Sequence, residues 1–171
     1  MLFRDRADAG IKLAHMLEQY RGQDCVVLAL PRGGVPVAAK VAEYLGAPLD
    51  LLLVRKVGVP HQPEVAMGSV IDGGQPIVVR DERTMRLSGA SEADFQRICA
   101  DELREIERRR ELYLGGRSPE PVEGRIAIVV DDGLATGNTM RAALYAVRRR
   151  HPARLIMAVP VAPAQTLSDL A

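Results

Sequence analysis

Short apolar runs alternate along the chain with segments whose apolar residues recur every three to four positions. The runs are rich in valine, leucine and isoleucine, which is typical of strands buried on both faces of a parallel sheet. The periodic segments are typical of amphipathic helices that cover such a sheet. The pattern therefore predicts a single-domain α/β fold, with a mostly parallel twisted sheet of about five strands flanked by helices. The expected strands are residues 24–30, 49–54, 75–80, 125–130 and 154–161.

Three of the periodic segments predict ordinary surface helices. Asp5 or Asp8 is available to cap the first helix, and Gly46 is a suitable stop for the second. The third starts after the pair Asn138–Thr139. The apolar stripes expected on these helices are Ile11, Ala14, Leu17 and Tyr20; Val37, Ala38, Val41, Tyr44 and Leu45; and Met140, Ala143, Leu144 and Val147.

A longer, strongly charged helix is predicted from Ser91 to Tyr113. Ser91 suits its N-cap, with Asp94 at the third helical position, and Gly115 suits its end. Phe95, Cys99, Leu103, Ile106 and Tyr113 are expected to form its apolar face. The arginine run 108–110 is interleaved with glutamates, which favours a solvated face over a nucleic-acid site.

Composition narrows the class of protein. The chain has 171 residues, of which 47% are hydrophobic and 26% charged, and these values suit one soluble globular domain. A net charge of +1 gives no bulk attraction to nucleic acid or to an anionic membrane. Cys25 and Cys99 lack zinc-site spacing and are expected to be buried free thiols. With no signal-peptide pattern at the start, we expect a cytoplasmic protein with no nucleic-acid or membrane partner.

The stretch VVDDGLATGNT, residues 129–139, joins an expected strand to an expected helix. Asp131 and Asp132 repel one another unless a cation or a ligand compensates their charge. The small and hydroxyl residues that follow let backbone N–H groups at a helix N-terminus approach an anion, as a phosphate cradle does. The loop is neither a Walker A loop nor G-x-G-x-x-G. Aspartates that only cap the helix are the alternative, but a sugar phosphate with vicinal hydroxyls suits the whole stretch better.

This stretch resembles the 5-phosphoribosyl-1-pyrophosphate (PRPP) signature of the type I phosphoribosyltransferases, in which a strand precedes two acidic residues, small residues and T-G-x-T. The resemblance implies that Asp131 and Asp132 contact the ribose 2′- and 3′-hydroxyls. It implies Mg²⁺ as the cofactor, held by the same two carboxylates directly or through ribose hydroxyls or water. The residues implied to hold the 5′-phosphate are Ala135, Thr136, Gly137, Asn138 and Thr139.

The stretch LALPRGGVP, residues 28–36, is similar to the first loop of the same family. Taken alone, it indicates only a tight turn between a strand and a helix. The resemblance implies that Arg32, Gly33 and Gly34 face the pyrophosphate of the donor. It also implies a cis peptide bond between Pro31 and Arg32.

The stretch VRKVGVPHQPEVAMGSV, residues 54–70, is similar to the mobile catalytic loop of the family. Arg55 and Lys56 would then contact the pyrophosphate end of the donor, although they are also what surface cations at a strand end would look like. His61 and Glu64 lie in this stretch, and we expect them to make loop or substrate contacts.

The resemblance covers about residues 25–161 and implies an enzyme that moves the phosphoribosyl group of PRPP to a nitrogen acceptor of the nucleobase kind and releases pyrophosphate. It leaves a homodimer open. A second hypothesis is a non-catalytic regulator that binds PRPP or nucleotides on the same fold, and a third is a generic phosphate-binding domain. The intact Arg55–Lys56 pair and PRGG loop favour the enzyme, and the paired aspartates disfavour the generic domain.

Two features depart from the family pattern. A helical insertion at about 81–113 is longer than the minimal core requires. The chain also stops at PVAPAQTLSDLA, where relatives commonly continue with another strand and a segment that covers the acceptor. We therefore expect residues 1–171 to be a phosphoribosyltransferase-like domain truncated at its C-terminus.

Overall fold

The computed structural model of the protein describes residues 3–73 and 75–170. They divide into two compact units. The first, called here the parallel-sheet unit, is formed by Met1–Leu52 and Pro119–Ala171. The second, called the antiparallel unit, is formed by Leu53–Ser118.

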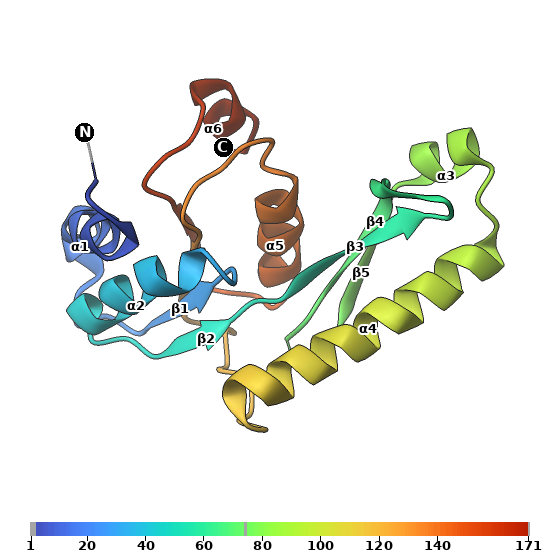
Figure 1. Ribbon diagram of the computed structural model, residues 1–171. Coiled ribbons are helices and arrows are strands. Elements are labelled where there is room, and N and C mark those ends of the chain that lie inside the picture. The colour runs from blue at the N-terminus through green and yellow to red at the C-terminus, as the bar shows by residue number, and fades with distance from the viewer. Residues whose placement is uncertain (1–2, 74, 171) are drawn as a thin grey trace. The chain divides into compact units, whose positions relative to one another are not determined.

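The parallel-sheet unit is built on four strands in the order β2-β1-β6-β7 (Figure 1). All three neighbouring pairs are parallel, which confirms the predicted α/β fold with a parallel sheet. The central strands consist almost entirely of buried apolar residues, as expected for strands covered on both faces. The strands are β1 (Cys25–Ala29), β2 (Leu49–Leu51), β6 (Ile126–Val130) and β7 (Arg154–Ala158).

Helices connect these strands into two β-α-β units, with α2 between β1 and β2 and α5 between β6 and β7 (Figure 1). Gly46 ends α2 in the left-handed conformation with φ of 67°, as the sequence predicts. Met140, Ala143 and Val147 are buried on α5, again as expected. The helical elements of this unit are α1 (Arg6–Met16), the 3₁₀ turn η1 (Glu18–Tyr20), α2 (Gly34–Leu45), α5 (Asn138–Arg148) and α6 (Ala164–Leu170).

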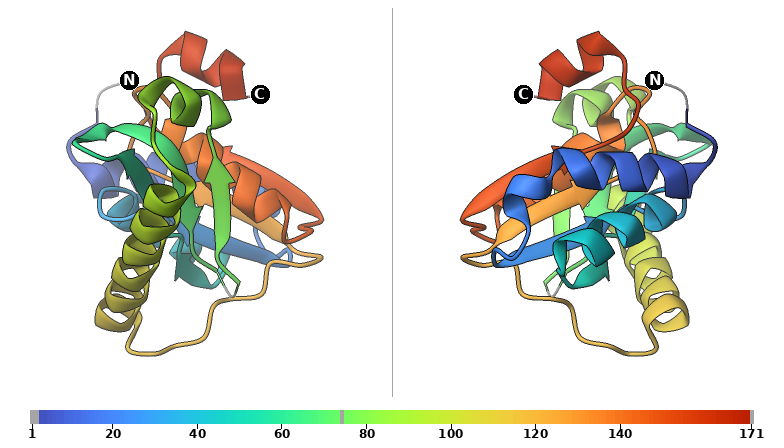
Figure 2. Two further views of the ribbon diagram at one scale, coloured as in Figure 1. Left: turned by 90° about the vertical axis from the view of Figure 1, so that its right-hand side faces the viewer. Right: turned by 90° about the vertical axis from the view of Figure 1, so that its left-hand side faces the viewer.

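The stripe predicted on and just after α1 is wrong at Ile11 but confirmed at its other members, which are buried: Ala14, Leu17 and Tyr20. Ile11 is 45% exposed, and the face against α2 is centred on Gly10 instead. A Cβ atom on Gly10 would lie 2.7 Å from the Val37 carbonyl oxygen and 2.9 Å from Lys40 Cβ. A hydrophobicity pattern misses this face because a glycine contributes close backbone approach and no apolar side chain. Figure 2 shows the two helices side by side.

The antiparallel unit corrects two expectations about the sheet. The run 75–80 does not join the parallel sheet: β5 pairs with β4, in the order β3-β4-β5. The stretch 54–70 is not an irregular loop but forms most of the antiparallel pair β3 and β4. The reason is visible in β5, where burial alternates and Val78 is 41% exposed, as in a sheet covered on one face. The strands are β3 (Val54–Val59), β4 (Gln62–Ile71) and β5 (Ile77–Arg80).

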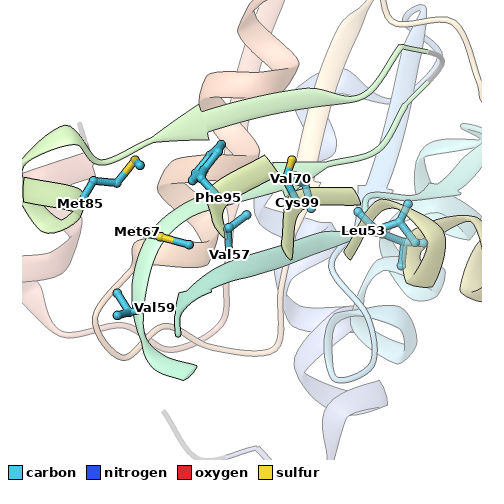
Figure 3. Close-up of a cluster of buried hydrophobic side chains, with 9 residues drawn as sticks. Leu53, Val57, Val59, Met67, Val70, Met85, Phe95 and Cys99 are labelled. Atoms are coloured by element: carbon cyan, nitrogen blue, oxygen red, sulfur yellow. The ribbon is translucent and has the colours of Figure 1, made fainter. Parts of the chain in front are cut away.

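Two helices follow this sheet, α3 (Glu82–Ser88) and α4 (Glu92–Leu114), so the predicted helical insertion is helical. The α4 helix begins with the expected capping box between Ser91 and Asp94. Its residue Phe95 is 1% exposed and packs over the backbone of Gly68, where an added Cβ would lie 3.0 Å from the Phe95 ring. Figure 3 shows the resulting core, formed by Leu53, Val57, Val59, Met67, Val70, Met85, Phe95, Cys99 and Ile106.

The charged face of α4 is only partly solvated. Arg109 Nε donates to Glu105 Oε1 at 2.7 Å, an i,i+4 pair that stabilises the helix. Arg110 does not belong to the exposed face, because its side chain is 16% exposed and its Nη1 lies 2.6 Å from Asp72 Oδ2. Tyr113, expected on the apolar face, is 40% exposed.

Cys25 and Cys99 are both free and buried, as predicted. Burial raises the pKa of both thiols above the usual value.

Within residues 3–73 and 75–170, none of the helices combines the length and the apolarity that crossing a bilayer requires.

The close crossing at Gly10 makes a stability prediction. We expect Gly10→Ala to lower the free energy of unfolding by about 1–3 kcal/mol, because the new methyl group overlaps backbone atoms that cannot rotate away. Ile11→Ala, at the exposed neighbouring position, should change it by less than about 1 kcal/mol. Urea unfolding of both variants measures this, and a Gly10→Ala protein as stable as the wild type would contradict the packing described here.

Candidate functional site

Two loops leave the sheet side by side because β1 and β6 are in-register neighbours. The last residues of the two strands, Ala29 and Val130, are partners, and the Leu30 N–H donates to the Val130 carbonyl at 2.9 Å. Each strand is followed by a loop and then by a helix N-terminus. The carboxyl edge of a parallel sheet is where α/β proteins bind ligands, so the two stretches singled out in the sequence share one such edge.

Glycines let the first loop lie directly on the acidic pair. A Cβ atom on Gly33 would overlap the Asp132 carboxylate, and one on Gly34 would lie 2.8 Å from the Val130 carbonyl oxygen. The peptide bond between Pro31 and Arg32 is cis, as the resemblance implied. The structure therefore brings the PRGG loop and the two aspartates together. The contact is so close that only glycine fits at positions 33 and 34.

The two aspartates are held in different environments. Asp131 Oδ1 accepts a hydrogen bond of 2.8 Å from the Asp132 backbone N–H. Burial of Asp131 raises its pKa from 3.8 to about 6, and the neighbouring Asp132 carboxylate adds to the rise. Both aspartates are half-buried, and 30% of the Asp132 side chain is exposed.

An arginine that the sequence analysis did not assign reaches this pair. Arg6 Nε lies 2.7 Å from Asp132 Oδ2, so a cation from the first residue of α1 compensates the acidic pair. The partners are 126 residues apart in the chain. Only the unexplained repulsion between Asp131 and Asp132 signalled in advance that some cation was needed.

The segment after the aspartates presents free donors at the start of α5. Ala135, Thr136, Asn138 and Thr139 are exposed, and Gly137 is buried with φ of 76°. No side chain caps α5, and in the part of the chain that the structure describes the N–H groups from Ala135 to Gly137 donate to no protein acceptor. The same holds in this part of the chain for the N–H groups of Arg32 and Gly33 before α2. Both helix starts can therefore hold an anion.

A second residue missed from the sequence lies behind this loop. Thr166 of α6 is 8% exposed, and its hydroxyl donates to the Ala135 carbonyl at 2.9 Å. The Leu134 N–H donates to the Val161 carbonyl at 2.9 Å, and a Cβ on Gly137 would lie 2.7 Å from Thr166 Cγ2. The segment 161–170 thus fixes the shape of the anion-binding loop. No local pattern in the sequence indicates this contact.

The remaining predicted site residues, Arg55 and Lys56, belong to the antiparallel unit. Arg55 Nε is held at 2.6 Å from Glu102 Oε2 of α4. Lys56 is exposed and lines a pocket of about 420 Å³ with His61, Arg97 and others. Of the two cations, Lys56 is the one that projects into a pocket, whereas Arg55 is engaged in an ion pair.

The acidic pair suits a divalent cation that also takes ligands from a substrate. Within the described residues no three His, Cys, Asp or Glu side chains are grouped as a self-contained metal site. One or two carboxylates completed by substrate oxygens and water are the usual protein environment of Mg²⁺. The Asp131–Asp132 pair fits that description, and Arg6 takes one carboxylate oxygen of it.

The raised pKa of Asp131 predicts a stability that depends on pH. The neutral carboxyl is favoured in the folded protein, so its stabilising effect is complete below pH 4 and is lost as pH rises through about 6. At pH 8, Asp131→Asn should therefore have a free energy of unfolding about 1 kcal/mol above that of the wild type, after allowance for the partly solvated carboxyl. Its unfolding temperature should be about 2–4 °C higher.

At pH 4.5 the gain from Asp131→Asn should be much smaller, because the wild-type carboxyl is then largely neutral. Thermal unfolding in the presence of a metal chelator at both pH values checks this. A variant that loses stability at pH 8, or gains equally at both pH values, would show that burial does not destabilise the Asp131 charge.

Comparison with known proteins places this geometry in a family. The family model described as "Phosphoribosyl transferase domain" matches residues 5–170. A Mycobacterium tuberculosis protein provisionally named a phosphoribosyl transferase is 46% identical over 162 residues. That match covers 95% of the chain but 36% of the relative, so the chain spans about a third of the length of the curated relatives it matches.

Two solved structures share the fold of the chain. The crystal structure of TT1426 from Thermus thermophilus has a TM-score of 0.81 and 42% identity, covering 99% of this chain and 80% of that one. A purine phosphoribosyltransferase from Pyrococcus horikoshii, 17% identical with a TM-score of 0.51, shares the fold over 92% of this chain and 74% of its own. The chain belongs to the phosphoribosyl transferase domain family.

Proposed function

We propose that the protein is a Mg²⁺-dependent phosphoribosyltransferase that moves the phosphoribosyl group of PRPP to a nitrogen acceptor and releases pyrophosphate. The observation that carries the proposal is the contact between the PRGG loop and the acidic pair at one edge of the parallel sheet. A sugar carrying two hydroxyls, a phosphate and a diphosphate needs carboxylates beside two separate anion-binding loops. A generic phosphate site needs only one such loop.

The parts of the donor are assigned to the chain by charge. Asp131 and Asp132 accept hydrogen bonds from the ribose 2′- and 3′-hydroxyls. The segment Ala135–Thr139 holds the 5′-phosphate through the free N–H groups from Ala135 to Gly137, with the Thr136 and Thr139 hydroxyls as further donors. The turn Arg32–Gly34 holds the pyrophosphate, with the Arg32 guanidinium and the free N–H groups of Arg32 and Gly33 as donors.

Catalysis in this proposal is electrostatic and needs no protein nucleophile. As the bond between C1 of the ribose and the pyrophosphate breaks, negative charge grows on the leaving group and positive charge grows on the sugar ring. Donors fixed around the pyrophosphate become more favourable as its charge grows, and carboxylates beside the ring favour a cationic sugar. In the antiparallel unit, Lys56 rather than Arg55 is the candidate cation for a substrate contact, because Lys56 lines a pocket and Arg55 is paired with Glu102.

Asp131 and Asp132 would hold Mg²⁺ directly or through ribose hydroxyls or water, and the ion would neutralise charge on the leaving pyrophosphate. The acceptor is proposed to be a nucleobase-like nitrogen nucleophile that attacks C1 from the face opposite the pyrophosphate.

The function is tested by measuring pyrophosphate release with PRPP, Mg²⁺ and a panel of purines and pyrimidines. The wild type should release pyrophosphate with at least one base. Asp131→Asn and Asp132→Asn should each lower kcat/KM by about 100-fold or more, because each removes a charge that the transition state requires. Asp101→Asn, on an exposed face of α4 in the other unit, is the matched control and should keep the wild-type rate.

Two results would overturn the proposal in different ways. PRPP binding without turnover on any base would favour a regulator that keeps the donor site. Full activity in both aspartate variants would remove the acidic pair from the site.

A further inference from the structure

We propose that Arg6 is the counter-ion of Asp132 and that it acts as a positioning residue which lets the acidic pair accept a strongly anionic sugar phosphate. The inference rests on the proposed function, because it assigns Arg6 a role toward the donor of that reaction. It concerns a residue outside the three stretches that resemble the family's loops.

The capping and packing of α1 fix the backbone position of Arg6 beside the acidic pair. Arg6 is the first residue of α1, immediately after Asp5, whose carboxylate caps the helix by accepting from the Asp8 N–H at 2.8 Å. One turn further on, Gly10 seats the helix against the backbone of Val37 in α2. Because α2 starts at the PRGG loop, α1 packs against the helix that follows this loop, and its position relative to the loop is fixed.

The two cations nearest to Arg6 in the chain on either side, Arg4 and Lys12, are engaged elsewhere. Arg4 Nη2 lies 3.3 Å from Asp8 Oδ1, and Lys12 Nζ lies 2.8 Å from Asp8 Oδ2. The hydrogen bonds from Lys12 and Arg4 hold the pKa of Asp8 at about 2, so this acid stays ionised and retains both partners. Of these three cations, Arg6 is the one that pairs with the acidic pair.

The Arg6 guanidinium has donors left over. Its Nε bonds Asp132, and its side chain is 62% exposed. Across residues 3–73 and 75–170, no protein acceptor takes a hydrogen bond from its two terminal nitrogens. A guanidinium anchored at Nε presents those two nitrogens as a fork, which matches phosphate oxygens.

The charge of Arg6 should change the affinity for the donor and the affinity for a divalent cation in opposite directions, which a role in packing alone would not do. Without Arg6, two carboxylates side by side would face a donor carrying several negative charges, so the affinity for the donor alone should fall. The same two uncompensated carboxylates should attract a divalent cation more strongly than the wild-type pair, because Arg6 no longer competes for Asp132. A purely structural role for Arg6 would weaken both kinds of binding together.

The experiment measures two affinities on four proteins, the wild type, Arg6→Gln, Arg6→Lys and Arg4→Gln. PRPP binding is measured by calorimetry in excess chelator, and Mn²⁺ binding without PRPP is measured from the electron paramagnetic resonance signal of free Mn²⁺. Arg6→Gln should bind PRPP about tenfold more weakly and Mn²⁺ about threefold more tightly. Arg6→Lys keeps the charge and should lie between Arg6→Gln and the wild type. Arg4→Gln removes a charge two residues before Arg6 and should match the wild type in both affinities.

The outcomes separate this inference from the proposed function. Opposite changes in the two affinities of Arg6→Gln support it. If the two affinities of Arg6→Gln are unchanged, or if both fall, the role of Arg6 is overturned. If the wild type still binds PRPP in that case, the proposed donor site is not affected. A wild type that does not bind PRPP overturns the donor site itself, and the role of Arg6 with it.

Discussion

The in-register parallel pairing of β1 with β6 decides where the rest of the parallel-sheet unit can lie. It puts the ends of both strands at one edge of the sheet, so that the PRGG loop and the acidic pair emerge beside each other. Among the residues that the structure describes, no side chain caps either of the helices that follow, α2 and α5. The strand register thus places both loops at the sheet edge where α/β proteins bind ligands, and the site proposed here uses both of them.

The acidic pair is the feature that the site must then stabilise. Two adjacent carboxylates cost free energy, and the protein offsets that cost in two ways. Burial leaves Asp131 with a raised pKa, and Arg6 supplies an ion pair to Asp132. The folded protein is more stable when the Asp131 carboxyl is neutral, whereas the proposed contact with ribose hydroxyls uses the ionised form.

The elements that hold the site were predictable because their signals are local. The strand, turn and helix around VVDDGLATGNT and PRGG follow from apolar runs, small residues and helical periodicity within a few dozen residues. The site partners Arg6 and Thr166 were not predictable, because each meets the site through contacts between distant segments of the chain. The same limit explains β5, whose apolar run suits either sheet until its pairing with β4 is known.

The central claim is that Asp131 and Asp132 bind the hydroxyls of a sugar phosphate. Its most direct test compares the binding of ribose 5-phosphate with that of 2-deoxyribose 5-phosphate. Both carry the same phosphate, so only a site that binds the 2-hydroxyl distinguishes them. Backbone amide NMR titrations should show ribose 5-phosphate shifting the resonances of Gly33, Asp132 and Thr136, and 2-deoxyribose 5-phosphate binding about tenfold more weakly. Equal affinities for the two sugars, or shifts that spare Asp132, would contradict it.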